Sequence, residues 1–141
     1  MTPTIRRMEP EELDNCAELY DRVVRRTFTW FDQLDDQAAK FRSEATQEEV
    51  YVALDGDRLV GLACFYRPDS FLHSLYVDFS EHGRGVGSAL LSHTEAIAET
   101  PVSLKVQTRN LQARRFYERN GFKIVEEGQD SEQSQWVRMA R

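Results

Sequence analysis

Closely spaced glycines mark the stretch of this sequence with the clearest chemistry. Gly83, Gly85 and Gly87 lie between an aromatic and aliphatic run, residues 71–77, and a segment with apolar residues at helical spacing, residues 86–97. The turn therefore lies at a helix N-terminus, where free backbone N–H groups and the helix dipole attract an anion, and glycine lets a phosphate approach closely. We expect a phosphorylated ligand here. The alternative is a turn in which the glycines serve only the backbone geometry.

The residues around this loop exclude two common phosphate sites. A nucleoside-triphosphate loop needs a lysine before the Ser or Thr that follows its last glycine, whereas Ser88 follows Gly87 directly. A dinucleotide site needs an acidic residue about twenty positions further on. That region holds Lys105 and Thr108 and no acid between them.

Composition narrows the class of protein. The 141 residues, 40% apolar and 30% charged, fit one domain over residues 1–141. The net charge of −6 argues against nucleic-acid binding and favours amine substrates. Without an apolar run long enough for a membrane or a signal peptide, we expect a cytoplasmic protein that does not bind a membrane. Cys16 and Cys64 lack the spacing of metal ligands, so no metal is expected.

The remaining pattern predicts strands and helices in alternation. Asp55-Gly56 indicates a hairpin turn, and a helix between residues 71–77 and 102–106 makes these two strands parallel neighbours. Strands are expected over residues 4–8, 50–54, 59–66, 71–77, 102–106, 122–127 and 135–140. Helices are expected from Pro10 to about Arg25, from Gly85 to about Thr100 and over Leu111–Arg119, with a shorter one between residues 27 and 49.

Two motifs together resemble the GCN5-related N-acetyltransferase superfamily. The family loop Gln/Arg-x-x-Gly-x-Gly/Ala reads His82-Gly83-Arg84-Gly85-Val86-Gly87 here, with His82 in place of Gln or Arg. The family motif Asn-x-x-Ala-x-x-Phe-Tyr-x-x-x-Gly-Phe is complete as Asn110, Ala113, Phe116, Tyr117, Gly121 and Phe122. The resemblance implies a single-domain α/β (α+β) fold. Its mixed, twisted sheet of six to seven strands is splayed around an acyl-CoA cleft and carries about four helices.

The resemblance also implies acetyl-CoA as the cosubstrate. The loop would hold its pyrophosphate mainly through backbone donors, and the strand at 71–77 would pair with the pantetheine arm. The implied cofactor-binding residues are Leu75, Tyr76, Val77, His82, Gly83, Arg84, Gly85, Val86, Gly87, Ser88, Asn110, Ala113 and Tyr117. Tyr117 would also be the proton donor to the departing thiolate. The alternative is a core tyrosine that hydrogen-bonds a neighbour.

Neither motif identifies the residues that would bind or deprotonate the acceptor amine. His73 lies four residues before Val77, so the two side chains should share a sheet face, and an imidazole could take a proton from an ammonium group. The alternatives are a buried histidine with satisfied hydrogen bonds and a partly exposed residue at the sheet edge. Phe28, Trp30 and Phe31 either line a substrate pocket or pack in the core.

We therefore predict an acetyl-CoA-dependent N-acetyltransferase that acts directly on a primary amine of a small molecule. One alternative is a protein or peptide N-acetyltransferase that modifies a lysine or an N-terminal amine. Others are a non-catalytic CoA-binding sensor module and a nucleotide-binding domain. A homodimer is compatible with each of these.

Overall fold

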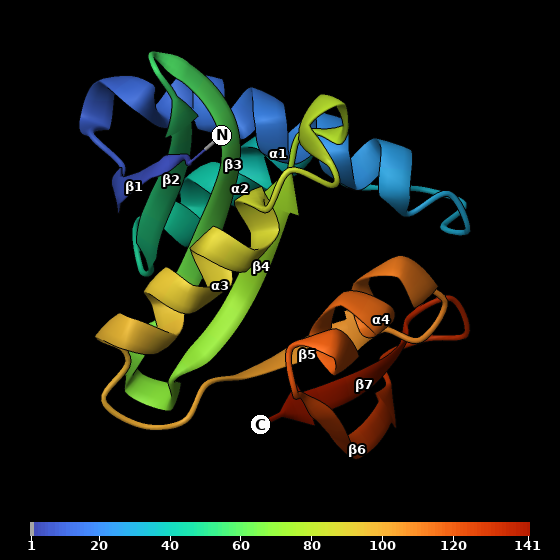
Figure 1. Ribbon diagram of the computed structural model, residues 1–141. Helices are drawn as coiled ribbons and strands as arrows, with labels where there is room; N and C mark the ends of the chain where they lie inside the picture. Colours follow the sequence, from blue (N-terminus) through green and yellow to red (C-terminus); the bar gives the residue numbers. More distant parts are fainter. Residues whose placement is uncertain (1) are drawn as a thin grey trace.

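Seven strands form one mixed sheet in the order β1-β2-β3-β4-β5-β7-β6 in the computed structural model, which describes residues 2–141 (Figure 1). The strands are β1 (Thr4–Arg7), β2 (Glu49–Asp55), β3 (Arg58–Tyr66), β4 (Phe71–Val77), β5 (Ser103–Gln107), β6 (Lys123–Gln129) and β7 (Gln135–Ala140). β4 and β5 pair in parallel, whereas the other neighbours are antiparallel. The predicted class, number of strands and parallel pair are confirmed.

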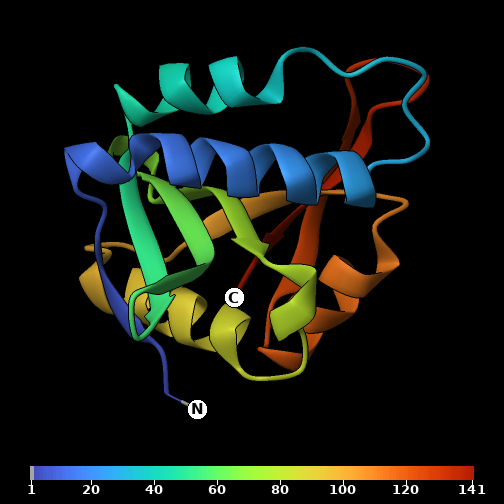
Figure 2. The ribbon, with the colours of Figure 1, turned by 90° about the horizontal axis from the view of Figure 1, so that it is seen from above.

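Helices cover both faces of this sheet (Figure 2). α1 (Leu13–Thr27) and α2 (Gln37–Ala45) lie on one face, and α3 (Val86–Ile97) and α4 (Leu111–Arg119) lie on the other. Pro10 begins a short 3₁₀ turn, Pro10–Glu12, that leads into α1. No helix within residues 2–141 is long and apolar enough to cross a membrane.

The core is divided into two layers by the sheet. On the α1 and α2 face, Cys16, Tyr20 and Phe41 pack against Val52 and Leu62. The opposite layer contains apolar residues of α3, α4 and the C-terminal strands, among them Phe65, Leu90, Leu104, Phe122 and Met139. The alternating apolar residues of β2 contribute to both layers because successive side chains of a strand point to opposite faces.

The sheet opens between β4 and β5. These strands are paired only at Phe71 with Ser103 and at Leu72 with Leu104 in the described chain. Beyond Leu72, β4 therefore leaves its neighbour and keeps a free edge. The splayed sheet that the resemblance implies is seen at this point.

β4 also departs from regular alternation. Its pairing with β3 shifts in register, so that Leu72 lies opposite Phe65 while Ser74 lies opposite Cys64. His73 is left as the extra residue of a β-bulge, which turns the following side chains to the other face.

The bulge overturns one expectation about His73. Its ring contacts Glu44 of α2, whereas Val77 packs in the layer of α3 on the opposite face. The prediction that His73 and Val77 share a sheet face is therefore wrong, because simple alternation does not hold across a bulge.

Candidate active site

A cavity of about 360 Å³ lies between the C-terminal end of β4, the glycine loop and α4. Both sequence motifs contribute to its wall, as does the open edge of β4. Its lining includes Leu75, Tyr76, Val77, His82, Gly83, Gly85, Val86, Gly87, Ser88, Asn110, Ala113 and Tyr117. Of the predicted cofactor-binding residues, all but Arg84 line this cavity.

The three glycines of the loop serve different purposes. Gly83 and Gly85 each have a φ of +81°, and a Cβ added to either would meet no atom within 4 Å, so the backbone conformation itself favours glycine. At Gly87 a Cβ would lie 3.3 Å from the Phe116 ring, so glycine there allows α3 to approach α4. α3 begins at Val86 without a side-chain cap, which leaves N–H groups of its first turn for an anion.

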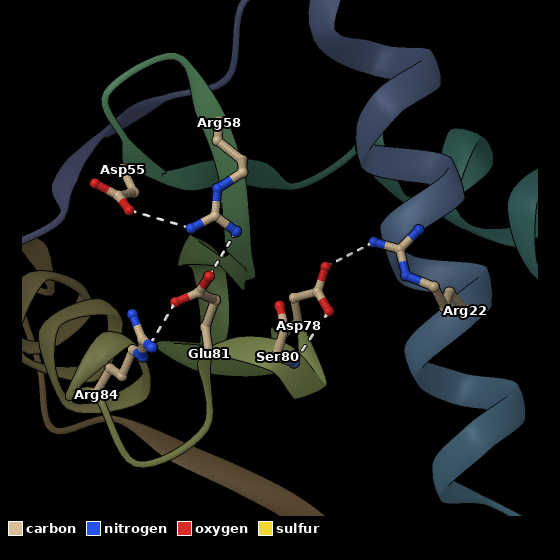
Figure 3. Close-up of polar contacts among 7 residues, drawn as sticks. All are labelled: Arg22, Asp55, Arg58, Asp78, Ser80, Glu81 and Arg84. Carbon is tan, nitrogen blue, oxygen red and sulfur yellow. Dashed lines mark hydrogen bonds and ion pairs between the residues drawn. The ribbon is translucent and has the colours of Figure 1, made fainter.

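Ion pairs attach the segment before this loop to the rest of the protein (Figure 3). Glu81 is only 3% exposed, and its carboxylate lies 2.5 Å from Arg58 of the β2–β3 hairpin and 3.7 Å from Arg84. Asp78 pairs with Arg22 of α1 at 2.9 Å. The Arg84 side chain is thus directed to Glu81, and it does not line the cavity.

The His82 ring spans two elements at the cavity wall. Its Nε2 lies 3.1 Å from the Val77 carbonyl oxygen, to which it donates, and its Nδ1 lies 3.4 Å from the Gln112 amide nitrogen. The ring also packs on Phe79 at 4.8 Å between centroids. Both ring nitrogens therefore have protein partners.

A second cavity, of about 550 Å³, lies on the other side of the open β4 edge. Of the three aromatic residues considered for an acceptor pocket, Phe28 and Phe31 line this cavity and Trp30 does not. Trp30 instead packs on these two rings, at 5.4 and 5.8 Å between centroids. Other lining residues are Tyr20, Asp35, Lys40, Phe71, His73, Lys105, Asp130 and Trp136.

A loop contact lies beside this second cavity, between neighbours of the lining residues Phe31 and Ser134. The backbone N–H of Asp32, in the connection between α1 and α2, donates to the Gln133 side-chain oxygen at 3.0 Å. Figure 2 shows that connection beside the β6–β7 turn. The two loops lie more than one hundred residues apart in sequence, so this contact could not be predicted from local pattern.

Five residues, Leu75, Tyr76, Asn110, Ala113 and Tyr117, line both cavities. The two spaces therefore meet where β4 faces the start of α4. Asn110 caps that helix, since its side-chain oxygen accepts from the Ala113 N–H at 3.2 Å. A group held in one cavity can thus reach a group held in the other.

Tyr117 lies at this junction and is 7% exposed. Its ring packs on Phe116 and Phe122 at 5.1 and 5.7 Å between centroids. Burial raises the pKa of its hydroxyl, because the charged phenolate would lose its hydration. The hydroxyl therefore stays protonated at neutral pH and can donate a hydrogen bond.

His73 lines the second cavity and is flanked by two carboxylates. Its Nδ1 lies 2.8 Å from Glu48, and its Nε2 lies 3.6 Å from Glu44. The hydrogen bond to Glu48 raises the pKa of His73, although burial opposes it. Burial raises the pKa of Glu44, which also lies 3.4 Å from the Tyr20 hydroxyl.

Sequence reasoning missed Glu44 and Glu48. They precede His73 by more than twenty residues, and no spacing links them to it. The three groups are near enough for metal ligands, but the carboxylates lie at different nitrogens of one ring. One ion cannot bind both ring nitrogens, so this arrangement fits hydrogen bonding better than coordination.

Comparison with known proteins identifies the class. The chain is 28% identical over 131 residues to the peptidyl-lysine N-acetyltransferase YjaB of Salmonella typhimurium, covering 89% of this chain and 86% of that protein. Its fold matches the apo form of YjaB from Escherichia coli with a TM-score of 0.83, at 24% identity over 99% of this chain and 97% of the other. It also matches the PaiA N-acetyltransferase of Thermoplasma acidophilum in complex with coenzyme A, with a TM-score of 0.80 at 19% identity over 99% and 98%.

A family model described as the acetyltransferase (GNAT) family matches residues 12–122, which is well over half of the chain. That span contains both motifs. The protein is therefore an acyltransferase that belongs to the acetyltransferase (GNAT) family.

Proposed function

We propose that the protein transfers an acetyl group directly from acetyl-CoA to a primary amine of a small molecule. One observation carries the proposal: a cavity beside an uncapped helix N-terminus joins a second, larger cavity at Tyr117 and Asn110. Direct transfer requires such a junction, because the amine nitrogen must reach the thioester carbon.

The residues present fit the implied cosubstrate. Backbone N–H groups at the start of α3 would hold the pyrophosphate, and the free edge of β4 from Leu75 to Val77 would pair with the pantetheine arm. In the transfer, the bond from nitrogen to the acetyl carbon forms and the bond from that carbon to sulfur breaks. Tyr117 donates its hydroxyl hydrogen bond to the sulfur as negative charge develops there.

The loop contact between Asp32 and Gln133 supports a small acceptor, because it joins two connections whose neighbouring residues line the cavity and so limits how far that side can open. A second candidate is the amine of a peptide. It is favoured by the relative from Salmonella typhimurium, which is named a peptidyl-lysine N-acetyltransferase. A lysine side chain is slender enough to enter this cavity while its backbone stays outside.

Thiol release from acetyl-CoA, measured across an amine panel, tests the proposal. The panel contains polyamines, aminoglycosides, amino acids, short lysine peptides and a folded lysine-rich protein. We expect the largest kcat/KM with a small amine. A larger value with the lysine peptides supports the second candidate instead, and coenzyme A binding without any transfer supports a non-catalytic module.

A further inference from the structure

Glu48 is a buried carboxylate beside the second cavity. It lies just before β2, and its side chain is 7% exposed. One oxygen lies 2.8 Å from His73 Nδ1, while the other, Oε1, has no hydrogen-bond partner among the described residues. A buried carboxylate is costly unless it is paired. His73 is the partner that offsets this cost.

The hydrogen bond decides which ring nitrogen carries the proton. An ionised carboxylate can only accept, so Nδ1 carries the hydrogen and donates it to Glu48. In the neutral ring the lone pair is then on Nε2. This nitrogen is 3.6 Å from Glu44, too far for a hydrogen bond, so its lone pair is not committed.

The charges around His73 favour the protonated ring. Glu44 and Glu48 face it from α2 and from the turn before β2, while Lys40 of α2 acts in the opposite direction. Tyr20 of α1 reaches this group only through Glu44. A proton received at Nε2 would face Glu44, while Nδ1 keeps its hydrogen bond to Glu48.

We propose that Glu48 is a positioning residue that holds His73 as the proton acceptor for the incoming amine. The inference rests on the proposed function. In this step an N–H bond of the substrate ammonium breaks, and the proton passes to Nε2 directly or through one water. The electron pair stays on the amine nitrogen, which is then able to attack the thioester. The imidazolium later returns its proton to solvent.

The first test observes His73 in the free protein, without any substrate. An NMR titration follows the His73 ring in the wild type and in Glu48→Gln. We expect the variant to titrate lower, by about one pH unit, because a neutral amide stabilises the imidazolium less than a carboxylate. The neutral wild-type ring should carry its hydrogen on Nδ1. An unchanged titration would overturn the proposal.

Glu49→Gln is the matched control. Glu49 follows Glu48 in sequence but pairs with Arg67 and Tyr51 rather than with His73. This variant should leave the His73 titration where the wild type has it. If both variants shift it equally, the effect is one of general charge and Glu48 has no special role.

The second test is the pH dependence of kcat/KM with an amine from the panel. The wild type should lose activity toward acidic pH as His73 becomes protonated, and Glu48→Gln should move this limb to lower pH with KM little changed. His73→Gln should abolish the limb. Superimposed profiles, despite a shifted NMR titration, would show that His73 is not the proton acceptor. Failure of every amine would overturn the proposed function and this catalytic role, while the NMR result still measures the coupling of Glu48 to His73.

Discussion

The Tyr117 hydroxyl is available as a donor because burial raises its pKa and keeps it protonated. Tyr117→Phe removes the hydroxyl while keeping the ring that packs on Phe116 and Phe122. We expect the fold and the acetyl-CoA affinity to survive. Single-turnover rates should fall by roughly 10- to 10³-fold, with kcat and kcat/KM decreasing together.

A packing role and a proton-donating role of Tyr117 predict opposite results for Tyr117→Phe. If Tyr117 served only the core, Tyr117→Phe would lower the melting temperature or weaken coenzyme A binding and leave the chemical rate intact. Rates within about twofold of the wild type on a good amine would exclude a proton-donating role. Any loss of wild-type rate from ionisation of this tyrosine should occur only above its ordinary pKa of about 10.

His82 is the residue that departs from the family loop, and its contacts suggest a small energetic role. Its ring nitrogens are directed to the Val77 carbonyl and to Gln112 rather than left free for a phosphate. His82→Ala should therefore bind acetyl-CoA with a Kd within about threefold of the wild type, or more tightly if the freed Val77 carbonyl favours the pantetheine arm. Calorimetric titration measures this. A tenfold weaker Kd would instead indicate a direct contact with the ligand.

Single residues were predictable from sequence where a motif carried them. The second motif led us to expect Asn110, Ala113 and Tyr117 at the cofactor site, and the structure places all three in the lining of both cavities. Glu48 was not predictable, because its link to His73 depends on a β-bulge and on the packing of a distant turn. Alternation along a strand is a local rule, and one inserted residue reverses its outcome.

The loop before α3 can be tested against a second glycine turn in the same chain, which serves as a matched control. Gly85 and Gly56 both have positive φ, +81° and +62°, and neither has an atom within 4 Å of an added Cβ. Valine at either position should cost about 1 to 3 kcal/mol of folding free energy through backbone strain. Only Gly85→Val should also weaken acetyl-CoA binding, by at least about tenfold, because it distorts the anion-binding loop.

Calorimetric titration and circular dichroism of the two variants separate these effects. Gly56 lies in the β2–β3 turn, outside the lining of both cavities. Gly56→Val should therefore lose stability yet bind acetyl-CoA normally. Normal binding by Gly85→Val would show that the loop is not the phosphate site.

The strands, helices and turns were predicted more completely than the contacts between loops that are distant in sequence. The helix between β4 and β5 required a parallel pair, and the Asp55-Gly56 turn required a hairpin, so both followed from local sequence. Nothing local indicated that the α1–α2 connection would meet Gln133 beside the second cavity. Such contacts between loops depend on the completed sheet, so the shape of the acceptor site could not be derived from sequence.

For the whole molecule, ligand binding should appear as added stability. Acetyl-CoA at about 100 times its Kd should stabilise the folded state by roughly 2.7 kcal/mol, provided that it does not bind the unfolded chain. The melting temperature should therefore rise by several degrees. Thermal unfolding with ATP and NAD serves as the comparison. A shift with either nucleotide and none with acetyl-CoA would contradict the proposed cosubstrate.

Acid should destabilise the whole molecule partly through Glu49, which joins β2 to the segment after β3. Arg67 donates to its two oxygens at 2.7 and 2.8 Å, and the Tyr51 hydroxyl donates at 2.6 Å. The hydrogen bonds from Arg67 lower the pKa of Glu49 to about 2. In the unfolded chain a glutamate titrates near 4.3. The stabilisation is therefore present above about pH 4.3 and is lost as the pH falls toward 2.

Urea unfolding of the wild type and Glu49→Gln at pH 6 and pH 3 measures this contribution. Glu49 is 19% exposed and Arg67 is more exposed, so solvent screening reduces the effect to about 1 to 2 kcal/mol. The stability advantage of the wild type over the variant should be larger at pH 6 than at pH 3 by part of this amount, because a carboxyl group with a folded pKa of about 2 is still mostly ionised at pH 3. Other carboxylates titrate over the same range, but they are common to both proteins and cancel in the difference. A difference that stays constant with pH would show that the ion pair with Arg67 does not set the acid stability of the fold.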